Sequence, residues 1–269
     1  ASVAIKSTGE YSIWGANMAP TGLTGQVTPL EINTVSYPTL SGTIYKAGIG
    51  GSYTGTSNDQ AVVLTSTGLF AWGAVGSLFS PTLTTSPGVA QITPPVGSSP
   101  IGLPIGLEPS DVKMLFAMYR TLILLSKSGD VYVLGYISGA LDGNGAVQGT
   151  AGSNVWQRVK IDATTYLTGV KAVRGHVGNT NMNALIAETN DGKLYTWGRT
   201  TFLGDGSGAT YRSYATEMTL PDEVKTKGIR MIGVTGGVMG GSSYNTYYVL
   251  SNAGNLYAMG DNKNYQCGA

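Results

Sequence analysis

The stretch IAETNDGKLYTWG at residues 186–198 decides the fold, because it has the pattern of one tight β-hairpin and recurs along the chain. It consists of an apolar run, a few small polar residues, a glycine, alternating apolar residues, and a large apolar residue before a second glycine. The other copies are AIKSTGEYSIWG at 4–15, VLTSTGLFAWG at 63–73, LLSKSGDVYVLG at 124–135 and VLSNAGNLYAMG at 249–260. In each copy the first glycine supplies the positive φ that a tight turn demands.

The five hairpins are evenly spaced over the whole chain. Their first glycines lie 59 to 63 residues apart, at Gly9, Gly68, Gly129, Gly192 and Gly254. A large apolar residue stands before the closing glycine of every copy: Trp14, Trp72, Leu134, Trp197 and Met259. We expect these five side chains to fill the gaps between neighbouring sheets, and the closing glycine to let the chain leave without a steric conflict.

A second, weaker element precedes four of the hairpins, at residues 44–47, 112–115, 170–173 and 229–232. It alternates apolar with basic residues, which indicates a strand with one wet face. Strand, hairpin and connecting segment make one small sheet per repeat, and such sheets bury their faces only against copies of themselves.

The predicted fold is therefore all-β: a β-propeller of about five blades, four full repeats plus a split one, built of small antiparallel sheets. We expect residues 1–269 to form a single propeller domain, and excision from a longer protein stays open. The N-terminal hairpin has no preceding strand in this sequence, and the C-terminal hairpin has no following one.

The repeats resemble those of the regulator of chromosome condensation family. The hairpins carry this resemblance together with the Gly-rich segments AGIGG at 47–51, VRGHVG at 173–178 and VTGG at 234–237, and with LGDGSG at 203–208 and NKNYQCG at 262–268. The family typically forms propellers of seven blades, more than these repeats can build. Its Gly-x-x-His motif has only a partial counterpart at Gly175-His176. The resemblance implies guanine-nucleotide exchange on a small GTPase as one possible activity.

Composition argues against several classes of function. Only 12% of residues are charged, the net charge is +1, and the 16 Lys and Arg are scattered, so we expect no nucleic-acid partner. No apolar run approaches the roughly 20 residues that span a bilayer, so we expect no membrane insertion. One cysteine, Cys267, and one histidine, His176, exclude a disulfide within the chain and a zinc site of Cys and His alone.

The loops between the first strand and the hairpin are the predicted ligand-binding rim, since they occupy the same position in each repeat. We place them at 50–60, 175–183 and 236–246. Tyr and Asn there suit adaptable polar recognition, including that of carbohydrate hydroxyls, although Asn, Gly and Ser also simply make long turns. The candidate ligand-binding residues are Tyr53, Asn58, Asp59, His176, Asn179, Asn181, Tyr244 and Asn245.

Other polar residues favour structural roles. The sequences at 142–145 and 205–208 lack the later ligands of a calcium loop, which leaves turn formation as the better interpretation. Glu188 lies in a predicted strand and has no identifiable carboxylate partner, and no nucleophile motif accompanies His176. We therefore predict no enzyme activity, no catalytic residues, no cofactor and no metal. The segment 74–111 holds seven of the 11 prolines and either packs over a blade or contacts a partner.

Three functions remain open. The first is a non-catalytic binding or adhesion module of an extracellular or virion-surface protein, such as a tail-fibre component that recognises a cell-surface glycan or protein. The second is nucleotide exchange on a small GTPase, as the family resemblance implies. The third is a structural spacer or assembly part of a larger particle.

Overall fold

The computed structural model describes most of the chain. The described residues are 1–20, 25–50, 59–73, 88–118, 121–136, 141–145, 152–179, 182–199, 203–204, 209, 211–239, 242–260, 262, 265 and 267–268. Within them, the side chains of 136, 152–153, 176–179, 182, 236–239 and 242–244 are outside the description. No described helix is long and apolar enough to cross a membrane.

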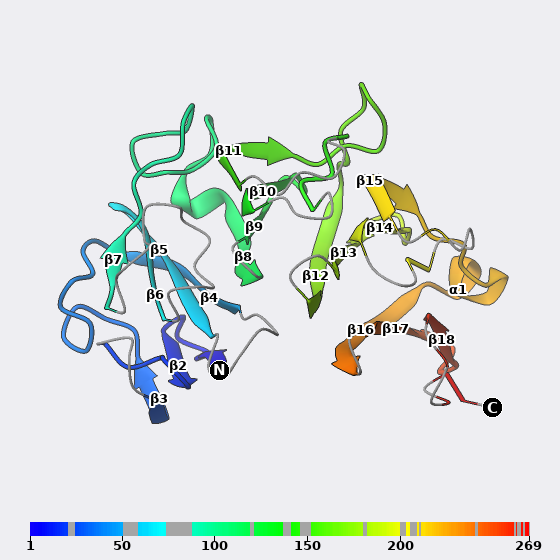
Figure 1. Cartoon of the computed structure of the whole chain (residues 1–269), viewed down its shortest axis with the longest axis horizontal. Helices are drawn as coiled ribbons and strands as arrows, with labels where there is room; N and C mark the ends of the chain where they lie inside the picture. Colours follow the sequence, from blue (N-terminus) through cyan, green and yellow to red (C-terminus); the bar gives the residue numbers. More distant parts are fainter. Residues whose placement is uncertain are drawn as a thin grey trace. The chain divides into compact units, whose positions relative to one another are not determined.

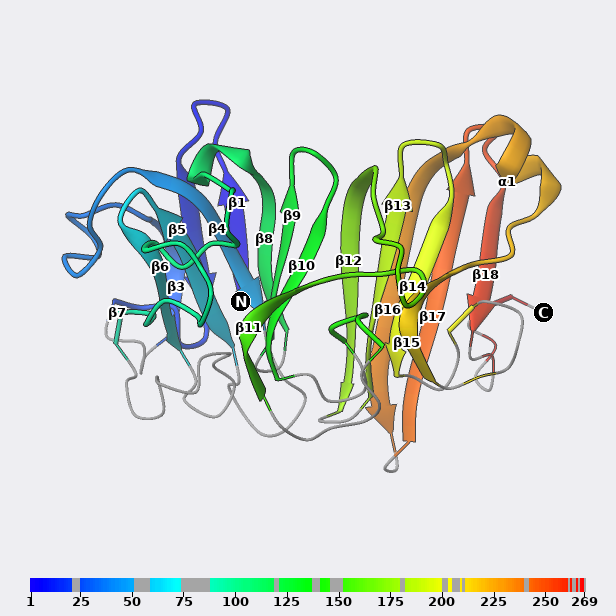
Figure 2. The same cartoon turned by 90° about the horizontal axis from the view of Figure 1, so that it is seen from above.

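The strands form five small antiparallel sheets, each from consecutive strands (Figures 1 and 2). The first contains β1 (Ser2–Ile5), β2 (Tyr11–Gly15) and β3 (Gln26–Glu31). The second contains β4 (Ile44–Gly50), β5 (Gln60–Thr65), β6 (Gly68–Gly73) and β7 (Ala90–Gln91). The third contains β8 (Val112–Met118), β9 (Thr121–Ser126), β10 (Val131–Tyr136) and β11 (Gly152–Arg158).

The fourth sheet contains β12 (Val170–Asn179), β13 (Met182–Thr189), β14 (Leu194–Arg199) and β15 (Tyr211–Glu217). The fifth contains β16 (Ile229–Met239), β17 (Ser242–Ser251) and β18 (Leu256–Gly260). A 3-10 turn η2 (Pro109–Asp111) precedes β8, and a short helix α1 (Asp222–Lys227) precedes β16. The predicted all-β, five-bladed propeller is confirmed. Among the described residues three sheets have four strands, the first has no strand before its hairpin, and the fifth has none after its hairpin, as the sequence led us to expect at both ends.

The chain divides into two compact units. One comprises residues 1–127, 132–136 and 151–157, and the other comprises 128–131, 137–150 and 158–269. The first unit holds two hydrophobic clusters, one between β4–β7 and β8–β11 and one between β1–β3 and β4–β7. The second unit holds a cluster between β12–β15 and β16–β18. Each unit thus buries apolar residues where successive sheets face one another, as the repeat pattern predicts; a single domain stays a prediction.

The glycines of the hairpin motif have the predicted backbone geometry. The five turn glycines have φ between +83° and +150°, and the five closing glycines between +101° and +123°. A Cβ on Gly198 would lie 2.5 Å from the carbonyl oxygen of Asn183, and one on Gly260 would lie 2.4 Å from that of Asn245. Glycine is therefore required at this position for two reasons: φ is positive, and the neighbouring strand leaves no space for a Cβ.

Three of the five predicted slot residues, Trp72, Leu134 and Trp197, are buried, whereas Trp14 and Met259 are half-buried. The indole nitrogen of Trp72 donates to the carbonyl of Met18, 3.4 Å away, in the segment after the preceding hairpin. The indole nitrogen of Trp197 donates to the carbonyl of Leu141 at 2.8 Å, again after the preceding hairpin. Both indoles are fully buried, so each joins its own sheet to the connection of the repeat before it.

Glycines in the first strand of a sheet allow two backbones to approach closely. A Cβ on Gly48 would lie 2.1 Å from the carbonyl oxygen of Leu115, and one on Gly50 would lie 2.0 Å from that of Ala117. Strand β4 therefore packs against β8 with no room for side chains at these positions. This contact explains the Gly-rich segment before the second hairpin.

A β-bulge recurs in all four first strands. The pairing register with the second strand shifts at Tyr45, Lys113, Lys171 and Arg230. A bulge puts one extra residue into a strand and bends it. The apolar–basic alternation predicted a plain strand with one wet face, but three of the four bases are the extra residue of a bulge.

Candidate functional site

Each sheet has two ends with different connections. At one end the second strand joins the third through the hairpin turn and its glycine, and we call this the turn end. Because the strands are antiparallel, the other end carries the connections from the first strand to the second and from the third to the fourth, and we call it the connection end (Figure 2). The predicted binding rim belongs to the connection end.

The predicted rim residues are only partly loop residues. Tyr53, Asn58 and Asn181 lie outside the described residues, and Asp59 lies directly before β5 and pairs with the N-terminal amine at 2.6 Å. The prediction that 175–183 and 236–246 are loops was wrong. The antiparallel ladder continues through pairs such as His176 with Ala184 and Gly237 with Tyr244.

The physical reason is that a continued ladder gives the backbone N–H and C=O groups hydrogen-bond partners. In a long loop these groups would need other partners. His176 and Asn179 therefore lie in β12, and Tyr244 and Asn245 lie in β17. Of these four side chains only that of Asn245 is described, and this residue is just 1% exposed. Asn245 helps to build the connection end and does not face solvent.

Buried polar side chains stabilise the connection end. The amide of Gln60 donates to the carbonyl of Met118 at 3.3 Å and so joins the second sheet to the third. Asn183 and Asn245, both buried, lie where the closing glycine of their own sheet packs. Burial raises the pKa of the Tyr247 hydroxyl to about 12. The base of the connections is therefore lined by buried polar side chains.

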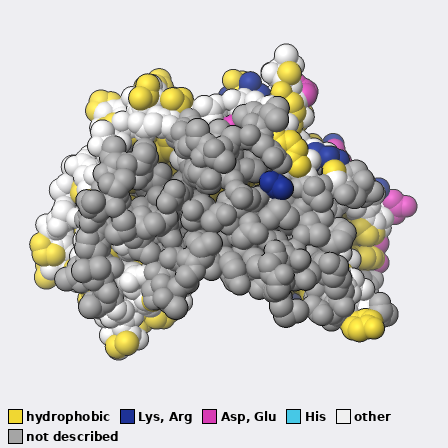
Figure 3. Space-filling view, in the orientation of Figure 1, with side chains coloured by type: hydrophobic (Ala, Val, Ile, Leu, Met, Phe, Trp, Pro, Cys, Tyr) yellow, Lys and Arg dark blue, Asp and Glu magenta, His cyan; other side chains and the backbone are white. Residues whose placement is uncertain are grey.

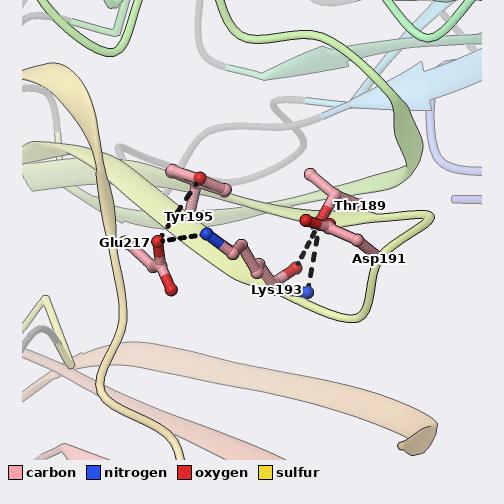
Figure 4. Close-up of polar contacts among 5 residues, drawn as sticks. All are labelled: Thr189, Asp191, Lys193, Tyr195 and Glu217. Carbon is pink, nitrogen blue, oxygen red and sulfur yellow. Dashed lines mark hydrogen bonds and ion pairs between the residues drawn. The ribbon is translucent and has the colours of Figure 1, made fainter. Parts of the chain in front are cut away.

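A polar cluster lies at the turn end of the fourth sheet (Figure 4). The Lys193 ammonium pairs with the Glu217 carboxylate at 3.0 Å, and the Tyr195 hydroxyl lies 3.5 Å from the same carboxylate. The Thr189 hydroxyl donates to the Asp191 carboxylate, which lowers the pKa of that carboxyl group. The hydrogen bond to Glu217 raises the pKa of Lys193.

Three residues of this cluster, Asp191, Lys193 and Glu217, line a hollow of about 210 Å³ together with Gly192, Met218, Leu220 and Lys225. Figure 3 shows basic and acidic side chains interspersed near α1, where Lys225 pairs with Asp222 at 3.2 Å. Both pKa shifts favour the charged forms that these groups already have at neutral pH. The arrangement therefore braces a turn and a strand end and has no group poised to exchange a proton.

Two other candidates have structural roles. Glu188 is buried and pairs with the Lys171 ammonium at 2.6 Å, which accounts for its place in the strand. Asp142 is buried in a turn, and burial raises the pKa of its carboxyl group. A Cβ on the next residue, Gly143, would lie 3.1 Å from the Trp197 indole, so this turn is shaped to pack against that ring. The described residues contain no group of three or more His, Cys, Asp or Glu that could hold a metal ion.

Sequence reasoning missed the fourth strands, which it treated only as connecting segments. Their signal is a pair made of a long polar residue and an apolar one: Glu31-Ile32, Gln91-Ile92, Arg158-Val159 and Glu217-Met218. All four apolar members are buried. The signal is short, and the strands that carry it range from two to seven residues, which is why the alternation alone does not reveal them.

The five sheets define a β-propeller, and its fold is similar to that of solved structures of RCC1. Prp20p from Saccharomyces cerevisiae is similar over 99% of this chain and 57% of its own, at 17% identity and a TM-score of 0.61. Yeast RCC1 (Prp20) in complex with Kap60 is similar over 99% of this chain and 55% of its own, at 16% identity and a TM-score of 0.59. Human WBSCR16 is similar over 92% of this chain and 54% of its own, at 14% identity and a TM-score of 0.54.

This likeness is one of fold. The chain spans little more than half the length of these structures. No protein-family model matches the sequence, and no curated protein matches it. The chain has an RCC1-like propeller fold, as the hairpin repeats and their resemblance predicted.

Proposed function

We propose that this chain is a protein-binding propeller module that takes its partner at the connection end. The observation that carries the proposal is the likeness to Prp20p over nearly the whole chain, because Prp20p binds Gsp1p and histones. The likeness to yeast RCC1 bound to Kap60 adds a further protein partner for the same fold.

The geometry of the sheets supports the connection end as the binding surface. This end joins strands by segments that differ in length from repeat to repeat, and variable connections on a rigid scaffold are where binding residues concentrate. Gln60, Asn183 and Asn245 are buried at the base of those connections, and Gln60 links the second sheet to the third there. At the turn end of the fourth sheet, by contrast, the charged groups are already paired with one another.

The first activity to test is acceleration of guanine-nucleotide release from a small GTPase. A panel of GTPases that includes Gsp1p is loaded with a fluorescent guanine nucleotide, and its release is followed with and without the chain. We expect at least tenfold faster release from one member, and saturable binding of that member by biolayer interferometry. Histones and Kap60 are tested for binding in the same way.

Matched variants separate the two ends of the sheets. Tyr53→Ala with Asn58→Ala changes the predicted rim, and Lys193→Ala with Lys225→Ala changes the turn end. We expect the first pair to weaken partner binding at least tenfold and the second to leave it unchanged. A folded chain, verified by circular dichroism, that binds no protein of the panel would overturn the proposal, as would binding lost only in the turn-end variant.

The glycan ligand, the adhesion or tail-fibre role and the extracellular or virion-surface location rest on loop composition and stay predictions. A glycan array with the same folded sample distinguishes them from the proposal. Glycan binding without any protein binding favours the adhesion role and contradicts a protein-binding module. The assembly role and the absence of enzyme activity also stay predictions.

A further inference from the structure

The first strand of the second sheet places a lysine on the face that meets the third sheet. Lys46 of β4 pairs with Leu64 of β5, and Gly48 pairs with Val62. Residues opposite one another in an antiparallel pair share a face of the sheet. Leu64 and Val62 are both buried in the cluster between the second and third sheets. The half-buried Lys46 side chain therefore projects from the face of the second sheet that packs against the third.

The close approach of β4 to β8 brings this lysine to the start of the third sheet (Figures 1 and 2). As described above, Gly48 lies against Leu115 and Gly50 against Ala117, so both strands advance by two residues between these contacts. The same offset places Lys46 beside the bulge at Lys113, near the turn end.

A third lysine lies at the same end of the third sheet. Lys127 directly follows β9, and its backbone N–H donates at 2.7 Å to the carbonyl of Asp111, the residue just before β8. Lys113 is the second residue of β8, so Lys113 and Lys127 stand on neighbouring strands at the turn end. Lys46, Lys113 and Lys127 thus gather where the turn ends of the second and third sheets meet, within one compact unit.

These three cations have no counter-charge of their own in the part of the chain that the structure describes. The ammonium groups of Lys46, Lys113 and Lys127 make no ion pair or hydrogen bond there. The carboxylate of the neighbouring Asp111 accepts the backbone N–H of Glu108 at 2.9 Å. Burial, and then the positive charge of Lys127, lower the pKa of Lys46. A partly desolvated cation beside a like charge is an arrangement that an anion relieves.

The fourth sheet shows which kind of group neutralises a lysine at this place. Glu188 takes the position of Leu64, four residues before the turn glycine, and it pairs with Ala172 as Leu64 pairs with Lys46. Its carboxylate binds the ammonium of Lys171 at 2.6 Å. Because Leu64 is apolar, the lysine of the second sheet has no such oxyanion in its partner strand.

We propose that Lys46, Lys113 and Lys127 form a binding site for a phosphate-type oxyanion at the turn end between the second and third sheets. A doubly charged phosphate has enough oxygens to accept hydrogen bonds from several ammonium groups at once, whereas a carboxylate brings a single charge. Its charge offsets the repulsion between Lys46 and Lys127. The partial burial of Lys46 makes this interaction less sensitive to screening by salt. The site concerns a different surface from the proposed function and does not depend on it.

The test titrates the whole chain, labelled with ¹³C at lysine Cε, with inorganic phosphate at pH 8 and constant ionic strength. NMR is expected to show saturable shifts of the Lys46 and Lys127 signals. The pKa of Lys46 should rise when phosphate is bound, because an anion stabilises the charged form. Signals of single lysines are needed because phosphate also stabilises folded proteins without a specific site.

A second titration with phosphoserine distinguishes two sources of the same chemistry. Binding at least fivefold tighter than that of inorganic phosphate supports the site with a phosphorylated side chain as its natural ligand. Equal or weaker binding supports the site with free phosphate as its ligand. Acetate is the third anion, and acetate binding as tight as that of phosphate would overturn the proposal, because the site would then take a single negative charge.

Matched variants test the residues. Lys46→Gln should weaken phosphate binding at least tenfold, because it removes the half-buried charge. Lys6→Gln removes an exposed lysine of the same unit that pairs with Glu31, and it should leave phosphate binding unchanged. Urea unfolding should show Lys46→Gln to be at least as stable as the unaltered chain, since the repulsion with Lys127 is gone. Absence of saturable shifts, or equal weakening of binding by both variants, would overturn the proposal.

Discussion

At the scale of single residues, the closing glycines carry the sharpest constraint in this fold. All five have a positive φ, and at Gly15, Gly73, Gly198 and Gly260 a neighbouring backbone also leaves no space for a Cβ. The structure also contains glycines with a positive φ and open surroundings, such as Gly169, which has φ +67° and no atom within 4 Å of an added Cβ. Substitutions at the two kinds of glycine therefore distinguish the cost of backbone strain from the cost of steric overlap.

Gly198→Ala should lower the free energy of unfolding by about 2–4 kcal/mol, because backbone strain and a 2.5 Å overlap with the Asn183 carbonyl add together. Gly169→Ala, in the same unit, should cost about 1–2 kcal/mol from strain alone. Urea unfolding of both variants measures the difference. Equal losses would show that the close approach at Gly198 is relieved at no cost.

Asp162 makes stability depend on acid pH. Backbone amides of Thr164 and Thr165 and the Thr165 side chain hold the pKa of its carboxyl group at about 2. This is below the value of about 3.9 in an unfolded chain, so its contribution is present above about pH 4 and is lost between about pH 4 and 2. Asp162→Asn should remove this contribution while keeping an acceptor oxygen. The difference in unfolding midpoint between the two proteins should shrink over that range, and a constant difference would contradict the assignment.

At the scale of elements, the recurrent bulge in the first strand puts similar bases into different surroundings. Lys171 extends to the buried carboxylate of Glu188, whereas Lys113 at the same bulge position is exposed. The bulge thus recurs in the backbone, but the side chain of its extra residue has different contacts in different sheets.

Lys171→Ala should destabilise the chain by about 1–3 kcal/mol, because it leaves a buried carboxylate without its cation. Lys113→Ala should change the free energy of unfolding by no more than about 0.5 kcal/mol. Thermal or urea unfolding gives both numbers. If Glu188→Gln restores the stability of Lys171→Ala, the loss is due to the unpaired charge, and failure of that rescue would point to lost packing of the lysine stem.

The same scale shows what the sequence could reveal. The hairpins were predictable because a turn glycine and an apolar slot recur together, and the packing of Trp72 and Trp197 between repeats follows from them. The bulges were not predictable, since an extra residue looks like ordinary alternation. The loop predicted at 236–246 was wrong because glycine and asparagine there suggest turns, whereas the ladder between β16 and β17 continues through residues 236–239 and 242–246.

At the scale of the whole molecule, apolar burial is organised by neighbouring sheets inside each unit. The cluster around Ile186, Tyr247 and Val249 lies in one unit, and those around Leu124 and Trp72 lie in the other. Repeat architectures behave as a sum of local stabilities and contacts between neighbours. Damage to one cluster should therefore be felt most strongly in its own unit.

Ile186→Ala should remove about 2–5 kcal/mol from the cluster of β12–β18. Native-state hydrogen exchange should then accelerate at least 30-fold in β13 and β17, and less than threefold in β5 and β9. Leu124→Ala is the matched variant in the other unit and should give the reverse pattern. An equal increase throughout the chain in both variants would show one cooperative structure instead.

The hydrogen bonds of the tryptophan slots have a direction that bears on biosynthesis. The indole of Trp197 donates to the carbonyl of Leu141, and that of Trp72 donates to the carbonyl of Met18. Each acceptor therefore lies more than fifty residues before its tryptophan in the sequence. The ribosome consequently synthesises each acceptor residue before the tryptophan that binds to it. Each newly emerged hairpin can dock on material already synthesised, and growth of the propeller need not wait for sequence still to be translated.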